Sequence, residues 1–243
     1  MLDNFSNNLK IVIIGATGAI GKAMLNIFAA NDKIDKIFAI SRSELEFDSA
    51  KVTKIRCDFL DEKSLENLDS EIDSDIDIVI VATGILHEVD LQPEKNIKEL
   101  SYKNMEQIFK INLFAPTIIG KYLLPKLVKD KRAVFAAISA RVGSISDNHL
   151  GGWYSYRASK AALNMMLKNF AIEMSRTNNQ KIVIALHPGT VKSKLSDPFS
   201  QFVKPEKLFS PEFAAESLIN VIDSVNIKDS GKIFAYDGKV IEY

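Results

Sequence analysis

Short runs that are apolar throughout alternate with longer amphipathic segments along the whole chain, and this alternation limits the fold more than any other feature. Continuously apolar runs are typical of strands that helices cover on both faces. Strands that alternate with helices indicate right-handed crossovers and a parallel sheet. We therefore predict one doubly wound α/β domain over residues 1–243, with about seven parallel strands and helices on both faces. The expected strands are Leu9–Ile14, Lys36–Ile40, Val52–Ile55, Ile76–Ala82, Ala133–Ile138, Ile182–Leu186 and Lys232–Tyr236. The expected helices are Ala19–Ala30, Asp61–Leu68, Lys103–Lys129, Tyr154–Arg176 and Pro211–Val225.

Composition excludes several classes of protein. The 31 basic and 31 acidic side chains balance, which argues against a broad nucleic-acid-binding surface. The longest stretch without charge, Ile11 to Gly21, is shorter than the roughly 20 residues that cross a bilayer. Cys57 is the only cysteine, so no internal disulfide can form, and no spacing of ligand residues indicates a metal site. We expect a cytoplasmic protein with no metal, no nucleic-acid partner, no signal peptide and no membrane segment.

The first apolar run ends in a glycine-rich turn that opens a helix. Gly15, Gly18 and Gly21 follow a G-x-x-G-x-x-G spacing. Glycine has no Cβ, so such a turn can be tight, approach a pyrophosphate and pack its helix closely on the strand. The free N–H groups and the positive dipole end of the helix favour phosphate. A tight turn without a ligand is the alternative. The strand before the turn and the helix after it favour a Rossmann-type dinucleotide site, to which Thr17 and Ile20 would also belong.

The second expected strand leads into Ser41 and Arg42, where a dinucleotide-binding fold contacts the adenosine ribose. An acid at this position holds the 2′-hydroxyl of NAD, whereas a base favours the 2′-phosphate of NADP. No acid follows until Glu44, and Arg42 with its flanking serines offers a guanidinium and hydroxyls to a phosphate dianion. We therefore expect NADP as the preferred cofactor, with NAD possible. A solvated loop arginine is the alternative.

Tyr156 and Lys160 lie four residues apart, which places a phenol and an ammonium on one face of a helix. A tyrosine with a pKa near 10 exchanges protons poorly at neutral pH, and a close cation lowers that pKa by about 1–3 units. The pair is therefore suited to move a proton to or from a carbonyl or alcohol oxygen. An ordinary pair on a helix surface is the alternative. Two strand ends favour the chemistry, because Ser139 ends one apolar run, Pro188–Val191 follows another, and ligands bind where parallel strands end.

In this order and over this length, the glycine-rich turn, the strand-end serine, Tyr-x-x-x-Lys and the Pro-Gly turn resemble the short-chain dehydrogenase/reductase family. The resemblance covers essentially the whole chain. The stretches GGWYSYRASKAALNMM and GKIFAYDG resemble the C-factor-like (cell–cell signalling factor) branch of this family. The resemblance implies an NAD(P)-dependent oxidoreductase that acts on a small molecule. It also implies a homodimer or homotetramer formed through Lys103–Lys129 and Tyr154–Arg176.

The resemblance implies four catalytic residues. Tyr156 would be the catalytic acid/base, and Lys160 would bind the nicotinamide ribose hydroxyls and lower the pKa of Tyr156. Ser139 would form a hydrogen bond to the substrate oxygen and help to polarise it. Asn112 would hold a water molecule in the proton relay.

The resemblance also implies cofactor contacts beyond the glycine-rich turn. Asp58 would contact the adenine amino group, with a turn or helix-cap role as the alternative. Val191 would offer its backbone to the carboxamide, and Ser193 stands where the family often has a threonine near the phosphates. The remaining expected contacts are Ala82, Thr83, Gly84, Tyr156, Lys160, Pro188 and Gly189.

Three features depart from the family pattern. The middle glycine of the turn has moved one position earlier, to Gly18. Val81–Gly84 replaces the usual Asn-Asn-Ala-Gly, so Thr83 and backbone groups would take over the amide contacts. The gap between the strand-end serine and the tyrosine is longer than usual, which predicts an enlarged loop, Arg141–Trp153, beside the active site.

The segment from 193 to 209 is long and shows no sustained period, and such segments inside compact domains are usually functional or mobile. We predict a lid over the substrate pocket, with a surface loop anchored by a few aromatic residues as the alternative. The apolar residues of this segment favour an apolar or aromatic carbonyl substrate. They are Leu195, Phe199, Phe202 and Phe209.

Three further side chains near these motifs have open roles. Trp153 would either cap the substrate pocket or pack against the start of its helix. His87 and His187 have no acid or cysteine at ligand spacing, so we expect structural roles for both.

The motifs together predict an NADP-dependent oxidoreductase that interconverts a carbonyl and an alcohol by hydride transfer. A dinucleotide-binding redox-sensing or signalling protein without physiological turnover is the alternative, because Val81–Gly84 departs from the family pattern. An epimerase or dehydratase that uses the same tyrosine is a third hypothesis, which the absence of an additional substrate domain disfavours.

Overall fold

The computed structural model describes residues 1–72, 75–176 and 180–243, and the side chain of Phe202 lies outside this description. The strands are β1 (Leu9–Ile14), β2 (Ile34–Ser41), β3 (Val52–Arg56), β4 (Ile78–Val81), β5 (Ala133–Ile138), β6 (Lys181–His187), β7 (Thr190–Val191), β8 (Leu208–Phe209), β9 (Ile233–Ala235) and β10 (Val240–Ile241). The helices are α1 (Ala19–Ala29), α2 (Glu62–Glu71), α3 (Tyr102–Phe109), α4 (Ala115–Leu123), α5 (Tyr154–Ser175) and α6 (Pro211–Ser224).

The described residues form one eight-stranded central sheet, in the order β10-β9-β6-β5-β4-β1-β2-β3. Seven of these strands are parallel to their neighbours, and β10 pairs with β9 in the antiparallel direction. The prediction of about seven parallel strands in a Rossmann fold is confirmed, with β10 as an additional edge strand. The strand order reverses between β1 and β4, and doubly wound sheets bind their ligands beside such a point.

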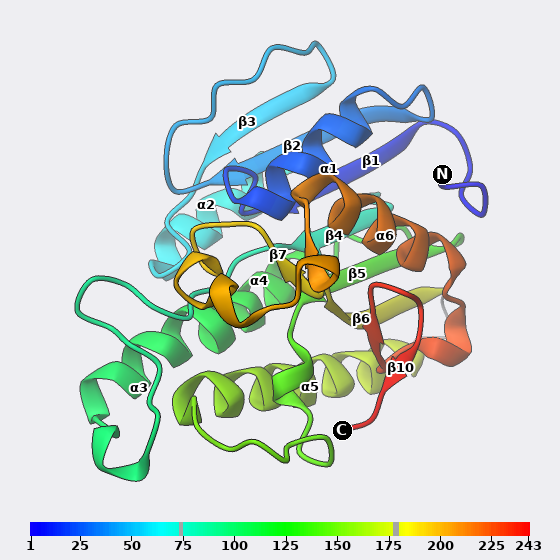
Figure 1. Cartoon of the computed structure of the whole chain (residues 1–243). Coiled ribbons are helices and arrows are strands. Elements are labelled where there is room, and N and C mark those ends of the chain that lie inside the picture. The colour runs from blue at the N-terminus through cyan, green and yellow to red at the C-terminus, as the bar shows by residue number, and fades with distance from the viewer. Residues whose placement is uncertain (73–74, 177–179) are drawn as a thin grey trace.

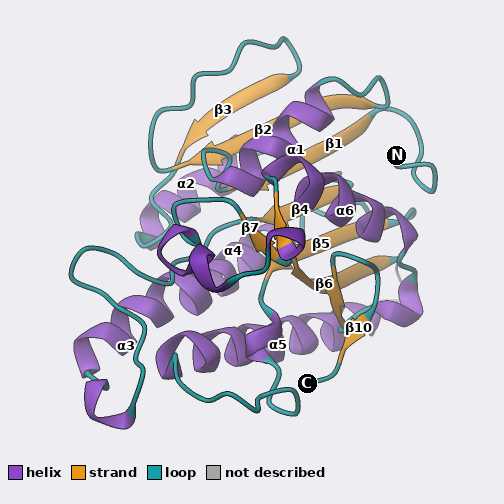
Figure 2. Ribbon diagram, in the orientation of Figure 1, coloured by secondary structure: helices purple, strands orange, loops and turns teal. Residues whose placement is uncertain are grey.

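Helices cover both faces of the sheet (Figures 1 and 2). One apolar cluster joins α1 and α6 to the sheet through residues such as Phe28 and Ile219. The other cluster joins α2, α4 and α5 to the opposite face. Ile11 and Ile13 of β1 belong to the first cluster, whereas Val12 belongs to the second. Both faces of β1 are therefore buried, which explains why its sequence is apolar throughout.

The helix predicted over Lys103–Lys129 is interrupted in its middle and ends earlier. A π-helical turn, Lys110–Phe114, joins α3 to α4 and carries the fully buried Asn112. Such turns often occur at functional sites. The prediction was wrong beyond Leu123. Leu124 still has helical backbone angles, but Pro125 has no N–H with which to continue the helix.

The segment from 193 to 209 folds into two 3-10 turns, Asp197–Phe202 and Pro205–Lys207, before β8 pairs with β7. It crosses in front of the sheet in Figure 1. Within the described part of the chain, no helix combines the length and the apolar character needed to span a bilayer. The same residues include no cluster of three or more metal-ligating side chains.

Candidate active site

A groove runs along the carboxyl ends of the parallel strands. It consists of two cavities of about 630 Å³ each, which share lining residues between the glycine-rich turn and the end of β4. The shared residues are Thr17, Gly18, Ala82, Thr83 and Gly84. The first cavity extends towards the ends of β2 and β3, and the second extends towards β5, β6, α5 and the segment from 193 to 209. The predicted turn and the predicted strand ends therefore meet in one groove.

The glycine-rich turn has the backbone that the sequence predicts. Gly15 has a φ of +88°, and a Cβ there would lie 2.8 Å from the carbonyl oxygen of Ala82. Gly18 is the N-cap of α1 and lines the groove. Because glycine has no side chain, no side-chain acceptor caps the first N–H groups of this helix. Gly21 does not line the groove, and its position in α1 packs against the backbone of Gly15. A turn of this geometry can cradle phosphate oxygens.

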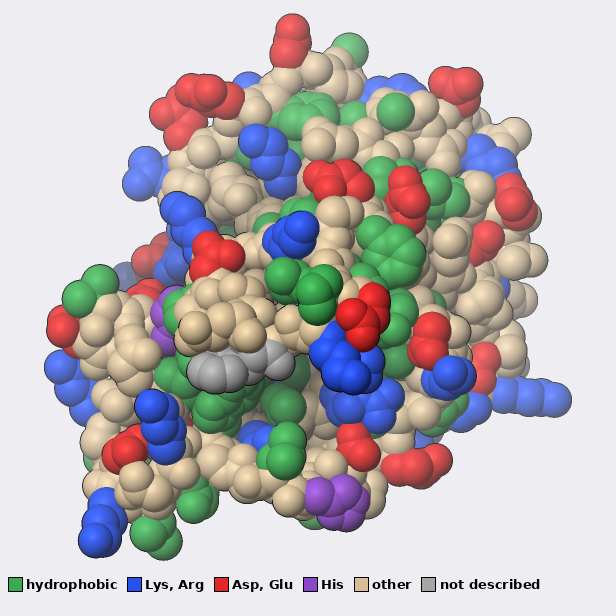
Figure 3. All heavy atoms as spheres, viewed as in Figure 1, with side chains coloured by type: hydrophobic (Ala, Val, Ile, Leu, Met, Phe, Trp, Pro, Cys, Tyr) green, Lys and Arg blue, Asp and Glu red, His purple; other side chains and the backbone are tan. Residues whose placement is uncertain are grey.

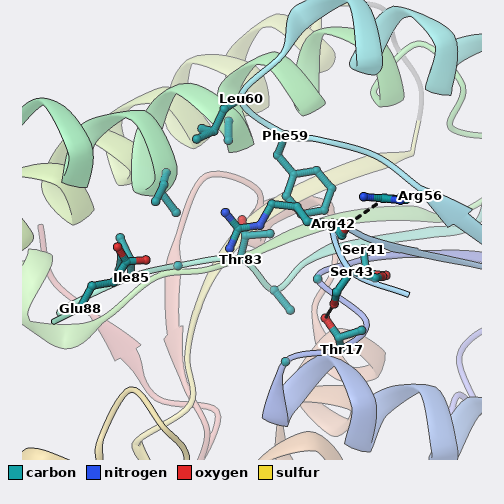
Figure 4. Close-up of a pocket in the computed structure, with 16 residues that line it drawn as sticks. Thr17, Ser41, Arg42, Ser43, Arg56, Phe59, Leu60, Thr83, Ile85 and Glu88 are labelled. Carbon is teal, nitrogen blue, oxygen red and sulfur yellow. Dashed lines mark hydrogen bonds between the residues drawn. The ribbon is translucent and has the colours of Figure 1, made fainter. Parts of the chain in front are cut away.

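Two arginines line the first cavity, at the ends of neighbouring strands (Figure 4). Arg42 follows β2, and Arg56 ends β3, where it pairs in register with Ser41. The Nε of Arg56 donates to the carbonyl oxygen of Arg42 at 3.2 Å, and the buried Ser41 hydroxyl donates to the carbonyl oxygen of Ser43 at 2.6 Å. Sequence reasoning missed Arg56, because only the register between β2 and β3 brings it beside Arg42.

Asp58 is not among the residues that line the groove. Its carboxyl group accepts a hydrogen bond from the backbone N–H of Leu60 at 3.0 Å, within its own turn. The neighbouring Phe59 and Leu60 line the first cavity instead. The structure thus brings this loop to the groove, and one oxygen of the exposed Asp58 carboxyl group accepts a bond within its own turn.

Tyr156 and Lys160 lie on the inner face of α5 and line the second cavity. Both side chains are buried, with exposed fractions of 9% and 2%. The Nζ of Lys160 lies 5.9 Å from the centre of the Tyr156 ring and donates to the carbonyl oxygen of Ile138 at 2.9 Å. The pair is therefore no ordinary pair on a helix surface.

Burial shifts the pKa values of this pair in opposite directions. Removal from water raises the pKa of Tyr156 to about 12 and lowers the pKa of Lys160 to about 8. The loss of hydration sets the direction of the Tyr156 shift, and the Lys160 ammonium donates to the Ile138 carbonyl. That Lys160 lowers the pKa of Tyr156 stays a prediction. Tyr156 keeps its proton at neutral pH and can donate it.

Ser139 lies at the end of β5 and lines the second cavity beside Tyr156. Its hydroxyl donates to Oδ1 of Asn164 at 2.7 Å, and Nδ2 of Asn164 lies 3.5 Å from the carbonyl oxygen of Gly143. Sequence reasoning missed Asn164, although it follows Lys160 by one turn of α5. Asn164 fixes the direction of the Ser139 hydroxyl.

Asn112 is fully buried behind the groove and does not line it. Its Oδ1 accepts from the backbone N–H of Ile85 at 2.8 Å, and its Nδ2 donates to the Ile85 carbonyl at 2.8 Å and to the Ser159 hydroxyl at 3.2 Å. A Cβ at Gly84 would lie 3.5 Å from both Asn112 Oδ1 and Lys160 Nζ. Asn112 therefore ties the end of β4 to the helix that carries Tyr156.

The turn after β6 forms another wall of the second cavity, which Ile20 also lines. Burial, with a contribution from Arg141, lowers the pKa of His187 to about 4. The His187 Nδ1 and the Thr83 hydroxyl are buried without hydrogen-bond partners among the described residues, and both residues line the groove. The predicted contacts in this turn all line the cavity, namely Pro188, Gly189, Val191 and Ser193.

These observations test whether a dinucleotide fits the groove. Phosphates need free N–H groups and close backbone approach, which the glycine cradle offers. A bound ring with polar groups would offer hydrogen-bond partners to the His187 Nδ1 and the Thr83 hydroxyl. Arg42 and Arg56, at the other end of the groove, suit a phosphate or a ribose. The residues present fit NAD(P).

Some residues of the segment from 193 to 209 line the second cavity, and others do not. Phe199 packs 5.1 Å from Trp153 and 5.6 Å from His87, between ring centres. The Nε2 of His87 contacts the backbone carbonyls of Lys194 and Leu195 at 3.1 and 3.2 Å. Phe209 packs on the Tyr236 ring and does not line the cavity, and the predicted contribution of Phe202 lies outside the described residues.

The enlarged loop predicted between 141 and 153 does border the second cavity. Arg141 and Val142 line it at one end of the loop, and Trp153 lines it at the other. The Trp153 ring also lies 6.2 Å from the Tyr156 ring. Trp153 therefore lines the pocket and also packs against the start of its helix.

The front face in Figure 3 shows Lys and Arg side chains interspersed with Asp and Glu. No single sign of charge gathers over this face, in agreement with the formal net charge of zero.

Comparisons with known proteins agree with the geometry. C-signal of Myxococcus xanthus is 29% identical over 145 residues, which are 60% of this chain and 82% of C-signal. A 1-hydroxy-2-glutathionyl-2-methyl-3-butene dehydrogenase of Rhodococcus sp. (strain AD45) is 33% identical over 60% of this chain, a match that spans 62% of that enzyme and so less than two thirds of it. The NADPH-bound carbonyl reductase from chicken fatty liver shares the fold, with a TM-score of 0.84, 21% identity and coverage of 98% and 96% of the two chains.

The family model for short chain dehydrogenase matches residues 10–204, which is most of the chain. The match to C-signal supports the resemblance to the C-factor-like branch. From its sequence and its fold, this protein belongs to the short chain dehydrogenase family and is an NAD(P)-dependent oxidoreductase.

Proposed function

We propose that this enzyme uses NADP to interconvert a carbonyl and an alcohol, and that it favours reduction of an apolar or aromatic carbonyl compound. One observation carries the proposal. A neutral phenol, Tyr156, lies buried at the second cavity beside the Ser139 hydroxyl and the Lys160 ammonium. An acid that keeps its proton at neutral pH is suited to protonate a developing alkoxide.

Each residue of the site has a separate task. The nicotinamide, when bound, supplies or accepts the hydride. Tyr156 donates its proton to the substrate oxygen. The Ser139 hydroxyl, which donates its one proton to Oδ1 of Asn164 in this structure, turns that proton to the same oxygen when the substrate binds. Lys160 holds the ribose hydroxyls and stabilises the phenolate that forms. Asn112 supports the proton path from behind through its contacts to Ile85 and Ser159.

The preference for NADP rests on the two arginines of the first cavity. Arg42 and Arg56 offer two guanidinium groups to a 2′-phosphate, and Ser43 adds a hydroxyl. Loss of one charged hydrogen bond costs about 1.5–3 kcal/mol, so Arg56→Gln should lower kcat/KM for NADPH by about 10- to 150-fold. The value for NADH should change little. If NADH supports turnover tenfold better than NADPH, NADP is not the preferred cofactor.

The apolar side of the second cavity supports the proposed substrate class. Its walls include Trp153, Leu195, Phe199 and Val203. Apolar pockets with a few placed polar groups bind substrates of matching character. NADPH consumption with a panel of aromatic and aliphatic ketones and aldehydes tests this class. Of the fold neighbours, one is named as a carbonyl reductase with bound NADPH, which supports the same reaction.

Tyr156→Phe is the decisive variant. Removal of the phenolic proton should lower kcat by about 10²–10⁴, while NADPH still binds because the cradle is intact. A variant that keeps more than a tenth of the wild-type rate would contradict the role of Tyr156. If the wild-type protein binds NADPH but reduces no compound of the panel, the redox-sensing alternative is favoured instead.

We also propose that the predicted homo-oligomer forms through α3, α4 and α5. Exposed apolar side chains on α3, on α5 and on the π-helical turn that leads into α4 support it, namely Met105, Phe114, Met165 and Ile172. The molar mass in solution, measured by light scattering, tests the proposal. A species at the mass of one chain, 27.1 kDa, would count against it.

A further inference from the structure

The entry into α5 lacks an acceptor of its own. Gly151, Gly152 and Trp153 have φ values of +63°, +64° and +48°, so three successive residues are left-handed. Trp153 is the N-cap and supplies no side-chain hydrogen bond. The first N–H groups of a helix need acceptors, and Ser, Thr, Asp or Asn usually provide one at this position. Another part of the chain must therefore supply hydrogen-bond acceptors to the N–H groups at the start of α5.

Glu94, from the loop between β4 and α3, accepts hydrogen bonds from the start of α5 with both its side chain and its backbone. One carboxyl oxygen accepts from the backbone N–H of Ser155 at 3.2 Å, and the other accepts from the Ser155 hydroxyl. The Glu94 carbonyl oxygen accepts from the backbone N–H of Trp153 at 2.5 Å. The Glu94 side chain is buried, with 3% exposed, so water does not compete for these bonds.

The residues that Glu94 holds are those next to the proposed chemistry. Tyr156 follows Ser155 directly, and the Trp153 ring contacts both Tyr156 and Phe199. A shift of the first turn of α5 would therefore move the phenol and one wall of the pocket together. Misplacement by about 1 Å can cost about 10²-fold in rate.

We propose that Glu94 is a positioning residue for the reaction, which caps α5 from outside the helix and sets the place of Tyr156 and Trp153. This proposal rests on the proposed function. No catalytic contact is assigned to Glu94, because it does not line the cavity.

Asp77 provides a matched control elsewhere in the fold. It is also a buried carboxyl group, with 1% exposed, and accepts from the backbone N–H of Lys10 at 2.9 Å. It pairs with Lys131 at 2.7 Å, beside the start of β4 and away from the groove. Asp77→Asn tests what a buried carboxyl-to-amide change does to the protein in general.

The experiment compares Glu94→Ala, Glu94→Gln and Asp77→Asn in the full chain, with kcat and KM measured for NADPH and for a carbonyl compound that the wild type reduces. Glu94→Ala should lower kcat at least tenfold and change KM for NADPH less than twofold. Glu94→Gln keeps an acceptor for Ser155 and should stay within about threefold of wild-type kcat. Asp77→Asn should leave kcat unchanged, whatever it does to the melting temperature.

A second readout does not depend on turnover. Trp153 is the only tryptophan of the chain, so intrinsic fluorescence reports on this helix entry. Glu94→Ala should shift the Trp153 emission to longer wavelength and increase its quenching by acrylamide, and Asp77→Asn should do neither. Ser155→Ala removes only the hydroxyl donor and should lower kcat about two- to fivefold, which gives a measurement if Glu94→Ala does not fold.

Wild-type kcat in Glu94→Ala would overturn the proposal, as would an equal loss of kcat in Asp77→Asn. Unchanged Trp153 fluorescence in Glu94→Ala would overturn it even if the wild type reduces no carbonyl compound, an outcome that defeats the proposed function separately.

Discussion

Replacement of Lys160 by methionine should abolish turnover and yet make the cofactor-free protein more stable at pH 7. Lys160 is 2% exposed, and burial lowers the pKa of its ammonium to about 8 from the ordinary 10.5. The folded chain therefore holds a charge that water would solvate better. Methionine has a similar length and carries no charge to desolvate.

The magnitude follows from the pKa. A fall from 10.5 to about 8 corresponds to about 3 kcal/mol of lost stability, at about 1.4 kcal/mol per pH unit. Methionine also loses the hydrogen bond to the Ile138 carbonyl, which costs about 1–2 kcal/mol. The free energy of unfolding should therefore rise by about 1–2 kcal/mol in Lys160→Met at pH 7.

The sign of the pH dependence is fixed by proton uptake. Below pH 8 the lysine is charged in both states, and the full cost of burial applies. Between pH 8 and 10.5 the unfolded state binds the extra proton, so wild-type stability gains with rising pH. The advantage of methionine should vanish near pH 10. Tyr156, whose raised pKa acts in both proteins, cancels in the difference.

Urea denaturation of both proteins at pH 7 and pH 10 measures these differences. Lys121→Met is the matched control, because Lys121 is exposed and pairs with Glu62 on the surface. Its effect should stay within about 1 kcal/mol at pH 7. A Lys160→Met protein that is less stable than wild type at pH 7 would refute the reasoning, as would a gain that persists unchanged at pH 10.

Three further substitutions test the cradle, the helix packing and the lid. Gly15→Ala places a Cβ 2.8 Å from the Ala82 carbonyl at a φ of +88°, so NADPH affinity in a fluorescence titration should fall at least tenfold; unchanged affinity would contradict the cradle. Gly120→Ala places a Cβ 2.6 Å from the Phe170 ring, so the ring or α4 must shift and the urea midpoint should show a loss of about 1–3 kcal/mol; a more stable variant would show that the ring moves freely. Phe199→Ala removes the ring that contacts Trp153 and should raise KM for an aromatic carbonyl compound about tenfold with KM for NADPH unchanged; equal effects on both would argue against a substrate lid.

The sheet was predictable because strands that are buried on both faces have sequences that are apolar throughout. The predicted bounds of the first and fifth strands coincide with β1 and β5. The glycine-rich turn is a local pattern, whereas the Tyr-x-x-x-Lys pair was assigned to the site only together with the strand ends at Ser139 and Pro188–Val191. The helix interruption at Asn112 was not predictable, because a π-helical turn leaves no periodic pattern that reasoning at 3.6 residues per turn detects.

The parts of the site that sequence reasoning missed depend on contacts between distant segments. Arg56 joins Arg42 through strand register, and Glu94 meets Ser155 across 61 positions of the chain. The desolvation that raises the Tyr156 pKa was also missed, because it depends on how much water the fold removes from the phenol. Propensity and spacing carry no information on that quantity.

The antiparallel edge strand has a consequence for how these molecules meet one another. β10 is two residues long and covers the otherwise open side of β9. A bare parallel edge would present a row of N–H and C=O groups to the sheet of another molecule. Removal of residues 240–243 would expose β9, and edge-to-edge aggregation should then compete with ordered self-assembly.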